Sequence, residues 1–188
     1  MGAAVAEVAA RPFVTVLGAD AFARLPEPVR RLHDLEAACA TAGRSDIEGA
    51  PGLLRRLFCW GAGLPSPGRD VPVTVEFQPT GDGREHWRRR FAARRYESVM
   101  RAGTGRDEGL LIEHFGLFDL VFALSVEPAG LRWRSVRLRL FGVGLPHALV
   151  PCVDALESGE NGRFTFDIDV AFAWLGLVLR YKGWLEPT

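Results

Sequence analysis

The stretch Arg163-Phe-Thr-Phe-Asp-Ile-Asp-Val-Ala-Phe172 alternates between large apolar residues and smaller or polar ones. Phe, Ile and Val occupy its even positions, while Arg, Thr, Asp and Ala occupy its odd positions. A period of two places successive side chains on opposite faces of an extended strand. The stretch therefore predicts a β-strand with one dry face against an apolar interior and one wetter face.

The same alternation recurs from Val71 to Pro187, with almost no helical pattern inside it. Turn-rich links, such as Gly159-Glu-Asn-Gly162, favour antiparallel hairpins between consecutive strands. A long meander tends to curl into a barrel or half-barrel, because closure removes exposed strand edges. The apolar parity also changes near Ser135, which predicts a β-bulge that bends the sheet. We expect strands at residues 71–78, 84–91, 96–101, 110–114, 117–127, 131–141, 153–158, 163–173 and 177–185.

The first third of the chain carries helical patterns instead. Residues 13–24 favour a helical face, and Glu27-Pro28 opens a second helix that we expect to run to about Ala40. A third helix is predicted after Pro51, because its apolar residues form a broad stripe. Core packing is the favoured role of this stripe, and a lid over a cavity is the alternative. The stripe consists of Leu53, Leu54, Leu57, Phe58 and Trp60.

Length and patterning together define the organisation. A chain of 188 residues suits one domain, large enough to bury about 70% of the surface that it exposes when unfolded. We expect a loose tail over residues 1–12 and a single domain over residues 13–188, with a helical part at 13–63 and a β meander at 71–187. The predicted fold class is α+β, mainly β. About nine antiparallel strands would form a strongly curved sheet or barrel, plugged or capped by the N-terminal helices.

Composition narrows the function classes. The formal net charge is zero, the three cysteines are far apart, and no motif has metal-ligand spacing. No phosphate-binding loop, nucleophile elbow or zinc-protease motif is present, and the glycines do not match a dinucleotide-binding pattern. The N-terminus lacks a signal peptide, and no run is long enough to span a membrane. We therefore expect a cytoplasmic protein without cofactor or metal.

Several polar residues are predicted at or near an apolar interior. Tyr181 shares its parity with apolar neighbours, so its hydroxyl should be buried and need a partner. Asp119 sits between two apolar residues, and His114 closes the preceding strand. With His86, these residues are candidate acids and bases in a cavity, while the simpler interpretation is ordinary hydrogen-bonded polar groups.

An apolar ligand is the favoured occupant of such a cavity. Aromatic residues are frequent on the predicted inner faces, and binding pockets are mostly apolar with a few placed polar groups. The sequence therefore predicts binding of a lipid, terpenoid or polyketide-like molecule. The candidate ligand-binding residues are Phe118, Phe122, Trp133, Phe164, Phe166 and Phe172.

Arginine is concentrated in the early strands, with eight arginines against two glutamates between Arg84 and Arg106. Trp87 and Phe91 share a face with Arg89, while Arg88 and Arg90 lie opposite. A solvated outer face explains this pattern best, since the neutral chain has no recognisable nucleic-acid-binding motif. A protein partner contacting Arg88, Arg90 and Arg94 is the alternative.

Several short motifs are dispersed along the chain. They are Gly63-Leu-Pro65, Gly68-Arg-Asp-Val-Pro-Val-Thr-Val75, Leu140-Phe-Gly142, Leu145-Pro146, Gly162-Arg-Phe164 and Arg180-Tyr-Lys-Gly-Trp-Leu185. Together these motifs resemble a bacterial family catalogued as domain of unknown function 4166.

The resemblance covers Phe13 to Pro187. It implies an accessory role near saccharopine-dehydrogenase-like oxidoreductases, with which members are often associated, and it carries no catalytic residues. Ala42–Gly49 departs from the family pattern, which implies a Gly-x-Val-x-Val-type strand there, and Trp174 replaces a usual proline.

Three functions follow as hypotheses. The first is binding of an apolar small molecule inside the curved sheet. The second is a cofactor-free cyclase or isomerase acting on such a ligand, with acid–base work by Tyr181, Asp119, His114 or His86. The third is a non-catalytic accessory domain that docks onto an oxidoreductase.

Overall fold

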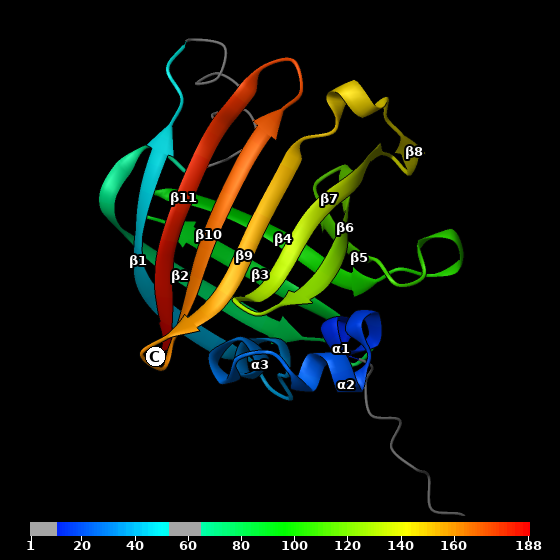
Figure 1. Cartoon of the computed structure of the whole chain (residues 1–188), viewed down its shortest axis with the longest axis vertical. Coiled ribbons are helices and arrows are strands. Elements are labelled where there is room, and N and C mark those ends of the chain that lie inside the picture. The colour runs from blue at the N-terminus through cyan, green and yellow to red at the C-terminus, as the bar shows by residue number, and fades with distance from the viewer. Residues whose placement is uncertain (1–10, 53–64) are drawn as a thin grey trace, which may run out of the picture.

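The computed structural model describes residues 11–52 and 65–188. Three short helices precede a long run of strands (Figure 1). The helices are α1 (Pro12–Leu17), α2 (Ala19–Ala23) and α3 (Glu27–His33), with short 3-10 turns η1 (Gly105–Asp107) and η2 (His147–Leu149). The strands are β1 (Cys39–Gly49), β2 (Gly68–Pro79), β3 (Arg84–Phe91), β4 (Arg94–Ala102), β5 (Leu111–Phe115), β6 (Phe118–Glu127), β7 (Gly130–Leu140), β8 (Val143–Gly144), β9 (Cys152–Glu160), β10 (Arg163–Phe172) and β11 (Gly176–Pro187).

Ten of these strands form a closed antiparallel barrel. Consecutive strands pair from β1 to β7, β9 continues the sheet from β7, and β10 and β11 follow. The last strand, β11, pairs with β1 and closes the barrel, while β8 pairs only with β7 and lies outside it. The predicted mainly β class with a curved or closed meander is confirmed.

All nine strands expected from alternation are present, with ends that differ by a few residues. The predicted bulge is also confirmed, because Val121 pairs with Arg137 while its neighbour Phe122 pairs with Ser135. One residue of β7, Val136, is left over at this point. The extra residue turns the apolar side chains on either side of it towards the same interior.

Two expectations for the first third were wrong. The helix that begins at Glu27 ends at His33, not near Ala40, and Cys39–Gly49 forms a strand. This strand escaped prediction because its inward positions carry Thr41, Gly43 and Ser45, which give no apolar alternation. The helix predicted after Pro51 and most of the predicted tail lie outside the described residues.

Close backbone contact marks the seam between β1 and β11. Gly43 pairs with Leu185, and Gly183 pairs with Ser45. A Cβ atom on Gly43 would collide with the carbonyl oxygen of Trp184, and one on Gly183 with the carbonyl oxygen of Arg44. Glycine is thus required on both strands where the sheet closes on itself.

The helices cover one end of the barrel (Figure 1). Helix α1 contacts β4, β5 and β6, and α3 contacts β9 and β10. Phe13 of α1 and His33 of α3 are completely buried. We call this end, with the links β2–β3, β4–β5, β6–β7 and β9–β10, the helix-covered end. No helix of the described residues has the length and hydrophobicity to cross a membrane.

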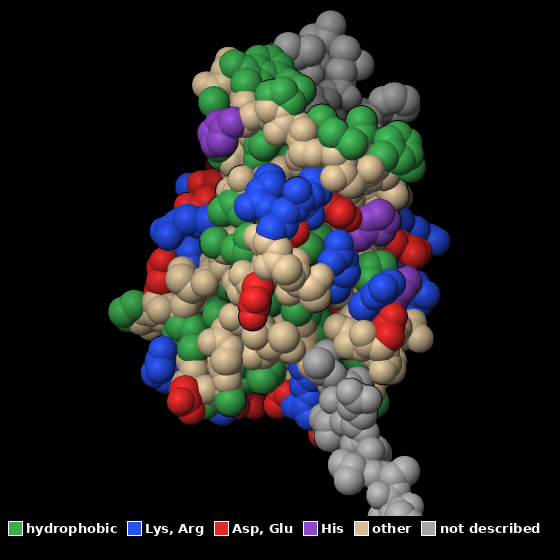
Figure 2. All heavy atoms as spheres, turned by 90° about the vertical axis from the view of Figure 1, so that its right-hand side faces the viewer, with side chains coloured by type: hydrophobic (Ala, Val, Ile, Leu, Met, Phe, Trp, Pro, Cys, Tyr) green, Lys and Arg blue, Asp and Glu red, His purple; other side chains and the backbone are tan. Residues whose placement is uncertain are grey.

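The links β3–β4, β5–β6, β7–β9 and β10–β11 lie at the opposite end, which we call the distal end. Figure 2 shows a belt of charged side chains around the middle of one face, with hydrophobic side chains gathered above it. The two ends of the barrel therefore differ in chemistry as well as in coverage.

Candidate functional site

A polar cluster points into the barrel near its distal end. Arg89 of β3 donates from Nη1 to Ser98 Oγ at 2.7 Å and to Glu113 Oε1 at 3.0 Å. Arg89 and Glu113 still expose 12% and 15% of their side chains. The alternation of β3 requires this direction, because the flanking Trp87 and Phe91 are also buried.

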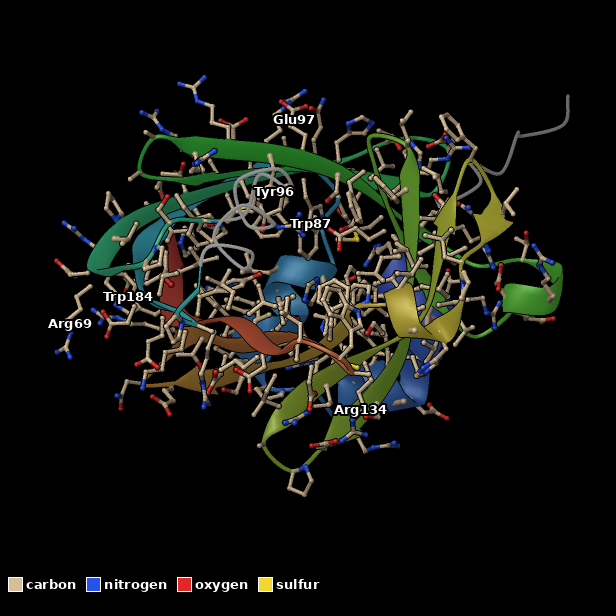
Figure 3. The ribbon with its side chains drawn as sticks, turned by 90° about the horizontal axis from the view of Figure 1, so that it is seen from above. Arg69, Trp87, Tyr96, Glu97, Arg134 and Trp184 are labelled. Carbon is tan, nitrogen blue, oxygen red and sulfur yellow. The ribbon has the colours of Figure 1, made fainter. Side chains whose placement is uncertain are left out.

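Aromatic rings surround the Arg89 guanidinium. Its Cζ atom lies 4.6 Å from the centre of the Trp87 ring and 5.1 Å from that of Tyr96. Trp87 and Tyr96 point into the barrel, whereas Glu97 points away from it (Figure 3). Contact with ring faces stabilises a cation in a poorly solvated place.

Two tyrosine hydroxyls complete this cluster. The side chains of Tyr96 and Tyr181 lie close enough to affect each other's pKa. Burial raises the pKa of Tyr96, and it raises the pKa of Tyr181 well above the ordinary value near 10. Both hydroxyls therefore remain protonated at neutral pH and can donate hydrogen bonds. We call Arg89, Tyr96, Ser98, Glu113 and Tyr181 the inner polar cluster.

The four predicted acid–base residues do not come together. Tyr181 belongs to the inner polar cluster, but His114 and Asp119 lie on the outer face, with 2.8 Å between His114 Nδ1 and Asp119 Oδ1. Arg101 approaches the same carboxylate at 3.7 Å. His86 lies on the face of β3 opposite to the buried Glu85 and Trp87, and therefore outside the barrel.

The six predicted ligand-binding aromatic residues all lie on inner faces. Phe118 is partly buried, and the other five are buried in the core. Phe122 and Trp133 meet edge to face at 5.5 Å between ring centres. Trp133 in turn lies 5.2 Å from Phe13 of the helix plug, so this pair belongs to the packed helix-covered end.

A second buried cluster was not predicted. His33 Nε2 lies 2.6 Å from Glu157 Oε2, and both residues are buried. Glu85 is 1% exposed and accepts a hydrogen bond from Trp87 Nε1 at 3.0 Å. Burial raises the pKa of Glu85, although nearby His33 and the Trp87 bond oppose the change. Glu85 and Glu157 could have been predicted to face inward, because each shares its parity with inward-facing apolar residues of its strand. No local sequence pattern predicts that His33 contacts β9.

The helix-covered end is filled with side chains. The Phe13 ring stacks on the His33 ring with 3.9 Å between centres, and Trp87 lies 5.9 Å from Phe13. Buried side-chain nitrogens of His33 (Nδ1) and Trp133 (Nε1) have no hydrogen-bond partner in the described part of the chain. The inner polar cluster lies beyond this plug, towards the distal end.

The arginines proposed for partner docking differ in their surroundings. Arg88 lies on the outer face, near Gln78 at 3.3 Å and near Glu76 and Glu97 at 3.7 Å each. Arg90 is exposed and donates to a backbone carbonyl of the β3–β4 turn. Arg94 begins β4 at the distal end and has no ion pair among the described residues.

Residues 11–52 and 65–188 form at least two hollows on the outer surface. One, of about 460 Å³, spans the outer faces of β1, β9, β10 and β11, and the other, of about 260 Å³, lies beside α3. Hydrophilic side chains including Arg44, Asp46, Asp167 and Lys182 line the larger one. Neither hollow includes a residue of the inner polar cluster.

Comparison with known proteins places the chain in a family. A family model described as "Domain of unknown function (DUF4166)" matches residues 25–185, which is most of the chain. A comparison with curated proteins gave no significant match.

Proposed function

We propose that this chain, which belongs to the DUF4166 family, binds an apolar small molecule with a polar head group inside its barrel. One observation carries the proposal: the inner polar cluster faces the interior of a closed ten-stranded barrel. The ligand class is a lipid, terpenoid or polyketide-like molecule. Its apolar body would lie against inward aromatic residues such as Phe118 and Phe166.

Barrel size supports this proposal. About eight strands give an interior that side chains can just fill, and wider barrels enclose ligand cavities or channels. Ten strands form this barrel, and the three helices of the described residues fill it from the helix-covered end. The distal half is therefore the part of the interior that a ligand would occupy.

The Arg89–Glu113 pair supports it as well. An apolar pair of similar volume is often as stable as a buried ion pair, so packing alone gives no reason to place one inside a barrel. Both side chains retain exposed surface although they point inward. Arg89 and the protonated Tyr96 and Tyr181 can donate to a carboxylate, carbonyl or hydroxyl oxygen of a ligand.

The four acid–base residues predicted from the sequence give catalysis less support. A cyclase or isomerase would need an acid and a base within reach of one point. Asp119, His114 and His86 lie on the outer face, while Tyr181 points inward, so these four do not converge. We therefore propose binding as the function.

Binding of a dansyl-labelled long-chain fatty acid tests the proposal, together with native mass spectrometry for a retained molecule. Arg89→Met should weaken probe binding by about 10- to 100-fold, because hydrogen bonds to charged groups contribute about 1.5–3 kcal/mol. Tyr181→Phe removes one hydroxyl from the cluster with little change of shape and should weaken binding less. Arg88→Met, at the adjacent outward position, is the matched control and should bind as the unsubstituted chain does.

Circular dichroism must show that each variant is folded. Equal binding by Arg89→Met, Tyr181→Phe and the control would contradict the proposal. An unsubstituted chain that neither retains a molecule nor binds the probe would contradict it too.

A further inference from the structure

Two connections at the distal end carry no charged side chain. Residues 140–153, between β7 and β9, contain no Asp, Glu, Lys or Arg, and neither do residues 170–179 around the β10–β11 turn. The two connections are neighbours, because Cys152 at the start of β9 pairs with Ala171 near the end of β10. They form one uncharged region, which we call the distal apolar rim.

Large hydrophobic side chains protrude from this rim. Phe141 is 72% exposed, Val143 68% and Trp174 59%, and Leu149 and Leu177 are also exposed. The hydrophobic side chains above the charged belt in Figure 2 occupy the end where β8 and η2 lie in Figure 1. Such a concentration of exposed apolar surface marks an interaction site.

Charges at the distal end, across the barrel opening from the rim, favour an anionic partner. The carboxylates that flank the two uncharged runs, Asp154 and Asp169, lie within ion-pair distance of Arg132 and Arg180. At the same end of the barrel, the β3–β4 turn carries Arg90, Arg94 and Arg95. Within residues 11–52 and 65–188, these three arginines have no ion pair, and the carboxylates of Asp46 and Glu48 on β1 also lack one at that end.

We infer that the distal end docks peripherally on an anionic lipid bilayer. Phe141, Val143 and Trp174 enter the boundary between head groups and acyl chains, and the arginines of the β3–β4 turn contact lipid phosphates. Protruding aromatic tips on separate links suit a deformable lipid surface better than a flat protein interface. Tryptophan also prefers the interface between membrane and water.

This inference rests on the proposed function in one respect. The inner polar cluster lies nearer to the distal end than to the helix-covered end, so an apolar ligand would enter the barrel from the bilayer on which that end rests. Docking itself requires no bound ligand, and the two ideas can fail separately.

Sedimentation of the full chain with vesicles tests the docking. One set of vesicles is phosphatidylcholine alone, and the other also contains phosphatidylglycerol. We expect binding to the anionic set, at least about 10-fold tighter than to the neutral set and weakened by salt. The double variant Phe141→Ser, Trp174→Ser should lose at least about 10-fold in binding, and Arg94→Gln with Arg95→Gln should remove most of the preference for anionic lipid.

Val136→Ser is the matched control. Val136 is 40% exposed on the barrel wall and is the one exposed large hydrophobic residue of the described chain that lies away from the distal end. This control should bind vesicles as the unsubstituted chain does. Equal binding by the double variant, or no binding to anionic vesicles, would overturn the inference.

A concentration-dependent dimer that the double variant abolishes, without vesicle binding, would also overturn it, since the rim would then join two copies of the chain. The fatty-acid probe separates docking from ligand binding. The double variant should keep probe affinity in solution, whereas Arg89→Met should lose probe affinity and still sediment with vesicles.

Discussion

Two phenylalanines show how differently the ends of this barrel are built. Phe13, in the helix plug, is completely buried and stacks on His33, which is held by Glu157. Phe141, on the link after β7, is 72% exposed. The same side chain supports the core at one end and faces the surroundings at the other.

The difference separates stability from interaction within one sheet. Buried apolar contacts are concentrated at the helix-covered end, where removing a side chain leaves a cavity. Exposed apolar residues at the distal end contribute little to folding and are free to contact a partner. The substitutions below test this division and the buried charges behind it, from the largest expected effect to the smallest.

Truncation of the two phenylalanines should give the largest contrast. Phe13→Ala should lower the free energy of unfolding by about 3–5 kcal/mol, because a fully buried aromatic side chain is lost and a cavity remains. Phe141→Ala should change it by less than about 0.5 kcal/mol. Urea unfolding of both variants measures the difference, and similar losses at the two positions would refute the division.

Neutralising the buried His33 partner should have a smaller effect. Glu157→Gln keeps an oxygen acceptor for His33 but removes the charge, so we expect a loss of about 1–3 kcal/mol. Asp167→Asn is the control, because Asp167 pairs with Arg180 on the exposed outer face, at 2.8 Å. Such pairs contribute at most about 1 kcal/mol. The prediction fails if thermal denaturation shows equal losses for both.

The pH dependence should be the subtlest effect. A raised pKa in the folded state means that Glu85 favours folding below its ordinary pKa and that this contribution is lost as pH rises through the raised value. Glu85→Gln should therefore stabilise the chain at neutral pH. It should also flatten the fall in melting temperature between mildly acidic and neutral pH.

The stabilisation by Asp107 should depend on pH in the opposite direction. Burial alone would raise its pKa, but hydrogen bonds and charge from Arg139 and Arg137 outweigh burial and lower it. The stabilisation by Asp107 is present above its ordinary pKa and lost as pH falls, so Asp107→Asn should remove stability at neutral pH and leave less to lose in acid. A steeper pH profile for Glu85→Gln than for the unsubstituted chain would contradict this account.

Alternation predicted most of the barrel because side-chain parity is a local property. It gave all nine strands from β2 onwards that belong to the barrel, a bulge near Ser135 and the shared face of Trp87 and Arg89. The same rule argues against the predicted place of Asp119 in the cavity. Its apolar neighbours Phe118 and Leu120 face inward, so parity puts its carboxylate on the outer face, where the structure has it.

Other features depend on partners that are distant in sequence. His33 meets Glu157 across 124 residues, and no local pattern could pair them. The inward residues of β1 are small, which allows its close contact with β11. Apolar alternation in the sequence gives no signal for such a strand. The inner polar cluster likewise draws on β3, β4, β5 and β11, so only its members' inward direction could be predicted.

The glycine seam between β1 and β11 also constrains the order in which this protein forms. Gly43 on the first strand pairs with Leu185 on the last. The barrel therefore cannot close until nearly the whole described chain has emerged from the ribosome. Until then, the apolar inner face of every earlier hairpin remains exposed and can contact other hairpins or other molecules. Slow, non-local closure of this kind makes the nascent protein a natural client for chaperones.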